Sequence, residues 1–163
     1  MSSAGGGDTR ILDVIRRVLG LLLLVALVGT SVELLLLEHD EDALQFIPLA
    51  LLAGGVVTLT MTAIRPAPLT MAAFRIVMVL MIVGGVLGMA LHFRANLEFQ
   101  RELTPEGTVS DLFWKAVSAK TPPALAPGVL AQLGCLGLIY AYRLPVGRTA
   151  AGRHEGERNV SIR

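Results

Sequence analysis

The chain has 163 residues, the length of one domain, and 53% of them are hydrophobic. Its net charge of +1 gives no field that would attract nucleic acid, and its single cysteine, Cys135, excludes an internal disulfide and a multi-cysteine metal site. Because apolar runs of about 20 residues match the roughly 30 Å hydrocarbon core of a bilayer, the chain is predicted to be an integral membrane protein.

The first apolar run predicts a membrane helix over residues 18–37. Residues 1–17 form a juxtamembrane N-terminal segment, and its Gly-rich beginning, 1–10, is predicted to be disordered. Small residues and one acid recur in the helix at spacings of three and four: Ala26, Gly29, Thr30 and Glu33. They share one face, and since small residues let helices approach closely in lipid, that face is predicted to pack against other helices.

A cleaved signal peptide is the alternative interpretation of this first run. Arg16 and Arg17 would be its basic region, and Gly29 and Ser31 the small residues before the cut. The apolar residues continue to Leu37, which favours a retained helix.

The second membrane helix is predicted over residues 43–64, after a short acidic turn at 38–42. Gly55 lies on its stripe of small packing residues. Arg65-Pro66 ends the helix, because a proline disfavours helical conformation in the residue before it.

The third membrane helix is predicted over residues 71–93. Gly84 and Gly88 form a GxxxG pair, which indicates a close helix contact within the chain or between copies. His92 follows four residues later and therefore lies on the same stripe.

A polar segment follows over residues 94–123. Its residues 97–103 are predicted to extend the third helix beyond the membrane, and 110–119 to form a short amphipathic helix with Ser110 as its N-cap. Two placements are open for this short helix: on the membrane surface or capping the bundle, and in an ordinary loop outside the membrane.

The fourth membrane helix is predicted over residues 126–142, with Gly134 and Gly137 on its small-residue face. The tail, residues 145–163, is polar and contains arginines, so it is expected to be disordered. The transmembrane domain is therefore predicted to span residues 18–144.

The predicted fold is all-α, an integral membrane bundle of four helices. With four crossings both termini lie on one side, and that side holds most of the fourteen basic residues. The positive-inside rule then predicts that both termini are cytoplasmic, while the acidic turn and the polar segment face outward.

Four polar side chains, one for each predicted helix, are expected in the outward half of the bundle: Glu33, Gln45, His92 and Gln132. An acid within a membrane is costly unless it is paired, protonated or in contact with water, and His92 is a candidate partner for Glu33. Two interpretations are open: a site for a proton, an ion or a small ligand, and a hydrogen-bonded clasp that fixes helix packing.

A second outward patch consists of acids and one histidine: Glu38, His39, Asp40, Glu98 and Glu102. Carboxylates combined with imidazole suit zinc. The chain has no HExxH motif, no paired cysteines and no EF-hand spacing, and an exposed acidic turn is usually solvated, so no metal and no cofactor is predicted.

The segments 92–99 (HFRANLEF) and 121–128 (TPPALAPG) resemble segments of small, uncharacterised bacterial four-helix membrane proteins. This resemblance covers the second half of the chain and implies an inner-membrane location with no known activity. A glutamate in the first of four helices is also similar to small multidrug transporters. This chain departs from them because it is longer, has few membrane aromatics and places Glu33 away from the midplane.

The expected function is that of a non-enzymatic structural or accessory membrane protein that acts through its outward surface and its helix contacts. The sequence has no Ser-His-Asp order, phosphate loop or Rossmann fingerprint. The alternatives are a small oligomeric transporter or ion-coupled carrier that uses Glu33 and His92, and, third, a membrane enzyme. The expected partners are the lipid bilayer and either a second copy of the chain or another membrane protein.

Overall fold

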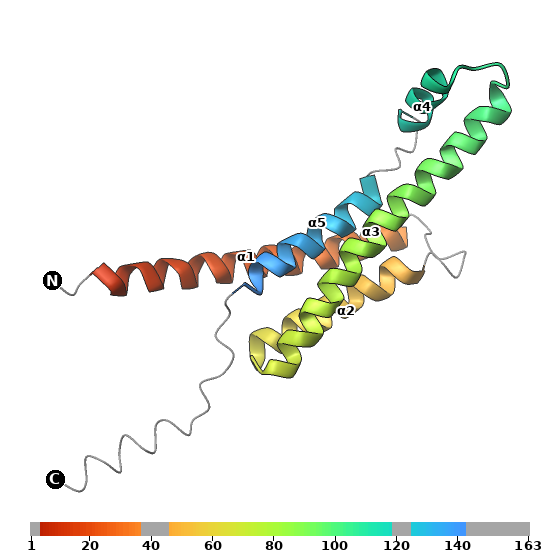
Figure 1. Ribbon diagram of the computed structural model, residues 1–163. Helices are drawn as coiled ribbons and strands as arrows, with labels where there is room; N and C mark the ends of the chain where they lie inside the picture. Colours follow the sequence, from red (N-terminus) through yellow and green to blue (C-terminus); the bar gives the residue numbers. More distant parts are fainter. Residues whose placement is uncertain (1–3, 37–45, 119–124, 143–163) are drawn as a thin grey trace, which may run out of the picture.

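A computed structural model describes residues 4–36, 46–118 and 125–142. The described residues form five helices, which Figure 1 shows in chain order. These helices are α1 (Ala4–Leu36), α2 (Phe46–Ile64), α3 (Pro68–Leu103), α4 (Val109–Val117) and α5 (Leu125–Tyr140).

Three of the helices are long and apolar enough to cross a membrane: α1 from Arg10 onward, α2 and α3. Their length and composition indicate a multi-pass membrane protein. The remaining apolar helix, α5, has 16 residues and is about 24 Å long at a rise of 1.5 Å per residue, which is shorter than a typical hydrocarbon core.

The helix boundaries depart from the predicted ones mainly at the N-terminus. Helix α1 begins at Ala4 and not near residue 18, so most of the segment predicted to be disordered is helical. This segment contains no proline, so no residue in it removes a backbone donor from the helix that continues from the apolar part of α1.

The other boundaries lie close to the predicted positions. Helix α2 ends at Ile64 as predicted, and α3 continues without interruption to Leu103, as expected for its extension. Thr108, and not Ser110, caps α4, because its hydroxyl accepts a hydrogen bond from the backbone N–H of Asp111 at 3.2 Å. The acidic turn at 38–42 and the tail at 145–163 lie outside the described residues.

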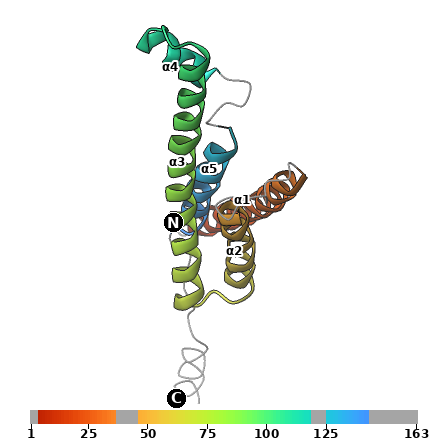
Figure 2. The ribbon, with the colours of Figure 1, turned by 90° about the vertical axis from the view of Figure 1, so that its right-hand side faces the viewer.

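Helix α3 organises the packing, since α2, α4 and α5 all lie against it. Helix α1 packs mainly on α2 and α5 and crosses the other helices obliquely (Figure 2). The largest fully buried side chains come from three helices: Leu23 and Leu27 of α1, Leu52 of α2, and Met71, Phe74, Met78 and Met81 of α3.

The contact between α3 and α5 is the most extensive in the molecule, and glycines make it close. A methyl group at Gly85 would lie 2.5 Å from the carbonyl oxygen of Pro127, and one at Gly134 would lie 2.5 Å from the carbonyl oxygen of Met78. A methyl group at Gly137 would overlap the side chain of Met78. The two backbones therefore approach to a distance that no other residue type allows.

The predicted packing glycines divide into two groups. Gly55, Gly84 and Gly88 also lie against neighbouring helices, facing Leu27, Leu51 and Pro127 respectively. Gly29 was predicted to pack as well, but it is exposed and has no atom of another helix within 4 Å of its would-be Cβ, because α1 turns its leucine face inward.

One end of the bundle is defined by contacts among three helices. Gly20 of α1 lies against the ring of Tyr140, which meets Phe74 of α3 edge-on at a centroid distance of 5.9 Å. The guanidinium of Arg75 donates a hydrogen bond of 3.0 Å to the carbonyl oxygen of Ala141, just after α5. The end of α5 therefore lies beside the beginning of α3, and a cation stabilises its free carbonyls.

Candidate functional site

The described residues of the predicted polar site do not form one cluster in the structure. Glu33, His92 and Gln132 are all exposed on the single chain, and Gln45 lies outside the described residues. Because α1 packs mainly on α2 and α5, Glu33 and His92 belong to helices that are not close neighbours. Among the described residues, neither of them makes an ion pair or a hydrogen bond.

The second predicted patch can be described only in part. Glu38, His39 and Asp40 lie outside the described residues. Glu98 accepts a 2.8 Å hydrogen bond from Nε of Arg94 one turn before it, and Glu102 is exposed. Within the part of the chain that the structure describes, no group of three or more His, Cys, Asp and Glu residues could hold a metal ion.

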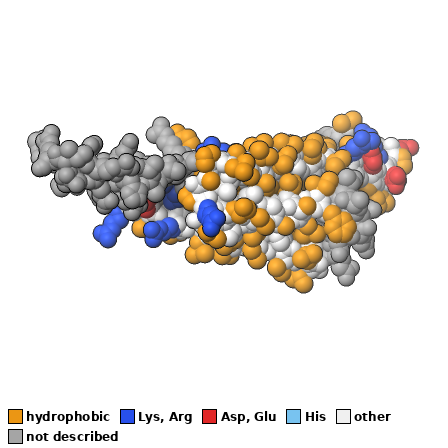
Figure 3. All heavy atoms as spheres, turned by 90° about the horizontal axis from the view of Figure 1, so that it is seen from below, with side chains coloured by type: hydrophobic (Ala, Val, Ile, Leu, Met, Phe, Trp, Pro, Cys, Tyr) orange, Lys and Arg blue, Asp and Glu red, His pale blue; other side chains and the backbone are white. Residues whose placement is uncertain are grey.

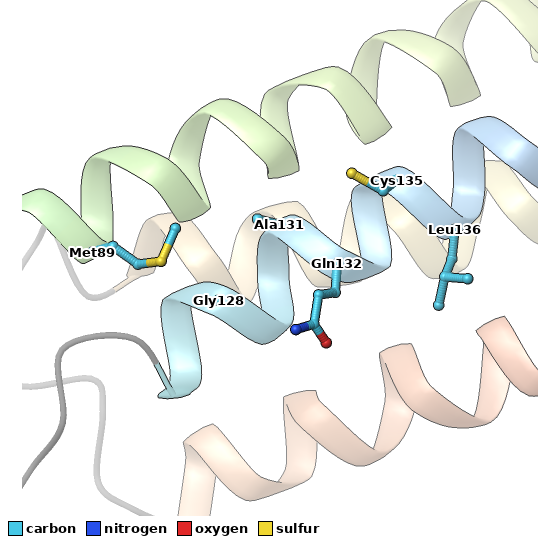
Figure 4. A pocket seen from close by; sticks show the side chains of 6 residues that line it. All are labelled: Met89, Gly128, Ala131, Gln132, Cys135 and Leu136. Atoms are coloured by element: carbon cyan, nitrogen blue, oxygen red, sulfur yellow. The ribbon is translucent and has the colours of Figure 1, made fainter.

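An open groove runs along the outer face of α5 (Figure 4). It has a volume of about 610 Å³, and its lining is apolar apart from one amide and one thiol. The lining residues are Met89 of α3 and Gly128, Ala131, Gln132, Cys135 and Leu136 of α5. In Figure 4 the side chains of Gln132 and Leu136 project from α5 toward the side where α1 lies.

Helix α4 folds back on the end of α3 and forms a helical hairpin with it (Figure 1). Leu112 and Ala116 are buried in this contact, and the side-chain amide of Asn96 donates a 3.3 Å hydrogen bond to the carbonyl oxygen of Ala116. The rings of Phe93 and Phe113 lie 5.6 Å apart. The hairpin thus brings α4 back to the level at which the apolar part of α3 ends.

Further apolar side chains of α4 lie beside this buried face. Val109, Phe113 and Val117 recur at a spacing of four and form an exposed stripe, and Trp114 beside it is 64% exposed. The ring of Trp114 meets that of Phe113 edge-on at 5.6 Å. The sequence predicted an amphipathic helix here, and the spacing of its apolar residues does not show which of them pack on α3 and which stay exposed.

The charged side chains are segregated along the molecule. On the face in Figure 3, hydrophobic side chains cover the middle, and Lys, Arg, Asp and Glu gather toward the two ends. One end carries Arg16 and Arg17 before Gly20 of α1, Arg65 in the turn between α2 and α3, and Arg75. The other end carries the α3–α4 hairpin.

The site region offers binding surfaces and no recognisable reaction centre among the described residues. The groove contains a single amide and a thiol, and the exposed polar side chains of Glu33 and His92 are not brought together. Comparison of the chain with protein-family models, with curated proteins and with solved structures gave no match.

Proposed function

We propose that the chain is a four-helix protein of a bacterial inner membrane, with both termini in the cytoplasm, and that it acts as a non-enzymatic structural or accessory component. It acts through the contacts between its helices and through the outward surface that the α3–α4 hairpin forms. The single observation that supports this arrangement best is the position of α5 against α3.

Helix α5 runs antiparallel to α3 within the apolar zone. Its beginning lies beside Gly88, through Pro127, and its end lies beside Arg75, through Ala141. Because α3 is long enough to span the membrane, a helix packed along this part of α3 shares the same apolar layer. A helix of 16 residues can do so when the bilayer thins locally or polar flanking residues reach toward the interface.

The orientation follows from the segregated charges. Arg16, Arg17, Arg65 and Arg75 lie at the end where α3 begins and α5 finishes, and where Gly20 of α1 contacts Tyr140. The positive-inside rule assigns that end to the cytoplasm, and the α3–α4 hairpin then faces outward. Trp114, whose ring meets that of Phe113, suits the membrane–water interface on that side, where tryptophan is enriched.

Cysteine labelling in intact cells tests the topology. In a Cys135→Ser background, Asp40→Cys and Gly107→Cys should react with a membrane-impermeant maleimide, and Arg148→Cys should react only after the cells are opened. Labelling of position 148 from outside would refute the arrangement with four crossings and both ends inside.

Vesicle experiments separate the accessory role from the carrier alternative. We expect purified protein in lipid vesicles to show no proton-coupled or ion-coupled uptake that depends on Glu33. Uptake that disappears in Glu33→Gln and persists in the matched variant Glu98→Gln, on the outward end of α3, would establish a carrier and overturn the accessory role.

A further inference from the structure

We propose that the chain forms a dimer in the membrane in which Glu33 on α1 of one protomer meets the partner's Gln132 on α5. The inference rests on the four-helix membrane arrangement proposed above. It is carried by two exposed polar side chains that lie at similar depth within the apolar layer and have no bonding partner among the described residues of their own chain.

The depth of both residues follows from the contact between Gly20 and Tyr140. Counting from this contact at 1.5 Å per residue, Glu33 lies about 20 Å along α1 and Gln132 about 12 Å along α5, measured from the same end of the bundle. The oblique course of α1 in Figure 2 reduces the difference further. Both residues therefore lie within a hydrocarbon layer of about 30 Å, and the remaining difference in depth is within reach of two extended side chains.

An exposed acid at this depth indicates an incomplete bundle. Ionisable side chains in membrane helices almost always face the interior of a bundle or a water-filled cavity, because hydrocarbon offers them no hydrogen bonds. Glu33 faces outward on the single chain, so the interior that covers it must belong to an assembly. A second copy meets this need because every copy carries the complementary amide of Gln132 at a similar depth.

The shapes of the two surfaces permit the contact. One turn before Glu33, Gly29 has nothing within 4 Å of its would-be Cβ, so another helix can approach α1 closely at that point. Gln132 lies in the open groove of α5, between Gly128 and Leu136 (Figure 4). A helix placed in the groove would bury its apolar lining and bring its own polar side chain to the amide.

The chemistry of the pair holds in either protonation state of the acid. An amide N–H of Gln132 donates to the carboxylate, and if Glu33 is protonated its O–H donates to the amide oxygen. Because α1 and α5 are packed neighbours, a two-fold axis between two protomers can form the contact twice. Glu33 of each protomer then meets Gln132 of the other.

Disulfide trapping between two differently tagged chains tests the dimer. One chain carries Gly29→Cys with Cys135→Ser, and the other keeps only its native Cys135, which lines the groove. Membranes that contain both chains are oxidised with copper phenanthroline, which should give a disulfide-linked dimer that carries both tags. The matched control is Val28→Cys with Cys135→Ser, at the same depth but about 100° around α1, and it should yield several-fold less.

The polar pair is tested in the same assay. Adding Glu33→Leu to the Gly29→Cys chain should reduce the two-tag product several-fold, whereas Glu33→Gln should retain most of it because an amide also bonds to Gln132. Equal yields for Gly29→Cys and Val28→Cys, or no two-tag product, would overturn the dimer. Labelling of Gly107→Cys from outside is measured in parallel. If neither the two-tag product nor this labelling is found, the proposed topology fails together with the dimer. If the labelling is found without the product, only the dimer is refuted.

Discussion

At the scale of single residues, glycines decide how closely α3 and α5 approach. Gly85 and Gly134 each face a backbone carbonyl of the other helix, so an added methyl group would meet atoms that cannot move aside. Gly54, by contrast, lies 3.7 Å from a flexible side-chain carbon of Val77, which is an ordinary contact. The cost of adding one methyl group therefore depends on the atom it meets.

We expect Gly85→Ala to lower the free energy of unfolding by about 1–3 kcal/mol, because the α3–α5 pair is overpacked and must separate. Gly54→Ala should be neutral or slightly stabilising, since alanine favours helix over glycine. Thermal unfolding of both variants in detergent measures the difference. Equal stabilities would contradict the close contact at Gly85.

Glu33 and His92 provide a second prediction at this scale. Because both are exposed on helices that are not close neighbours, their substitutions should act independently. In a double-mutant cycle, Glu33→Gln and His92→Gln should be additive within about 0.5 kcal/mol in thermal unfolding. A larger coupling energy would show that the two side chains meet after all.

At the scale of the element, the apolar face of α4 is wider than its contact with α3. Leu112 and Ala116 are buried against α3, while the adjoining stripe through Val109, Phe113 and Val117 stays partly exposed on the single chain. A soluble loop helix would direct polar residues outward. The uncovered stripe, at the level of Phe93, favours contact with the membrane interface over free solution.

Trp114, the only tryptophan, reports on this contact directly. In lipid vesicles its emission should be blue-shifted and weakly quenched by aqueous iodide, because lipid covers a side chain that the protein leaves 64% exposed. Quenchers attached to lipids near the headgroups should be effective. Emission like that of free tryptophan would place α4 in water and leave it an ordinary loop helix.

At the scale of the whole molecule, Tyr140 connects three helices. It is buried near the end of α5, its ring meets Phe74 of α3, and Gly20 of α1 lies against it. Together with the hydrogen bond from Arg75, this contact holds α1, α3 and α5 together at the end of the bundle that the proposed topology assigns to the cytoplasm. The other end carries the hairpin that projects beyond the bundle (Figure 1).

We expect Tyr140→Ala to destabilise the protein by about 2 kcal/mol, mainly through the cavity that it leaves among the three helices. Ile139→Ala is the matched control, because Ile139 is the preceding residue and is 62% exposed, and its effect should be within about 0.5 kcal/mol. Thermal unfolding in the same detergent compares the two. A similar loss for both variants would mean that Tyr140 does not tie the helices together.

The helical elements of this protein can be predicted from its amino-acid sequence. Long apolar runs can satisfy their backbone hydrogen bonds in lipid only as helices, so the cores of α1, α2 and α3 were predictable, as was the end of α2 before Pro66. The GxxxG pattern correctly identified Gly84 and Gly88 as contact residues. These inferences depend on local periodicity, which a sequence displays directly.

Which helix faces meet is known only from the way the helices pack together. The small-residue stripe of α1 predicted that Gly29 and Glu33 pack inward, but the leucine stripe through Leu23 and Leu27 fills the core instead, and both stripes have the period of a helix. Likewise, spacing cannot show whether Glu33 lies near His92, because their distance depends on which helices are neighbours. That choice is made by the fit of complete surfaces, above all the glycine contact between α3 and α5, and not by any single segment.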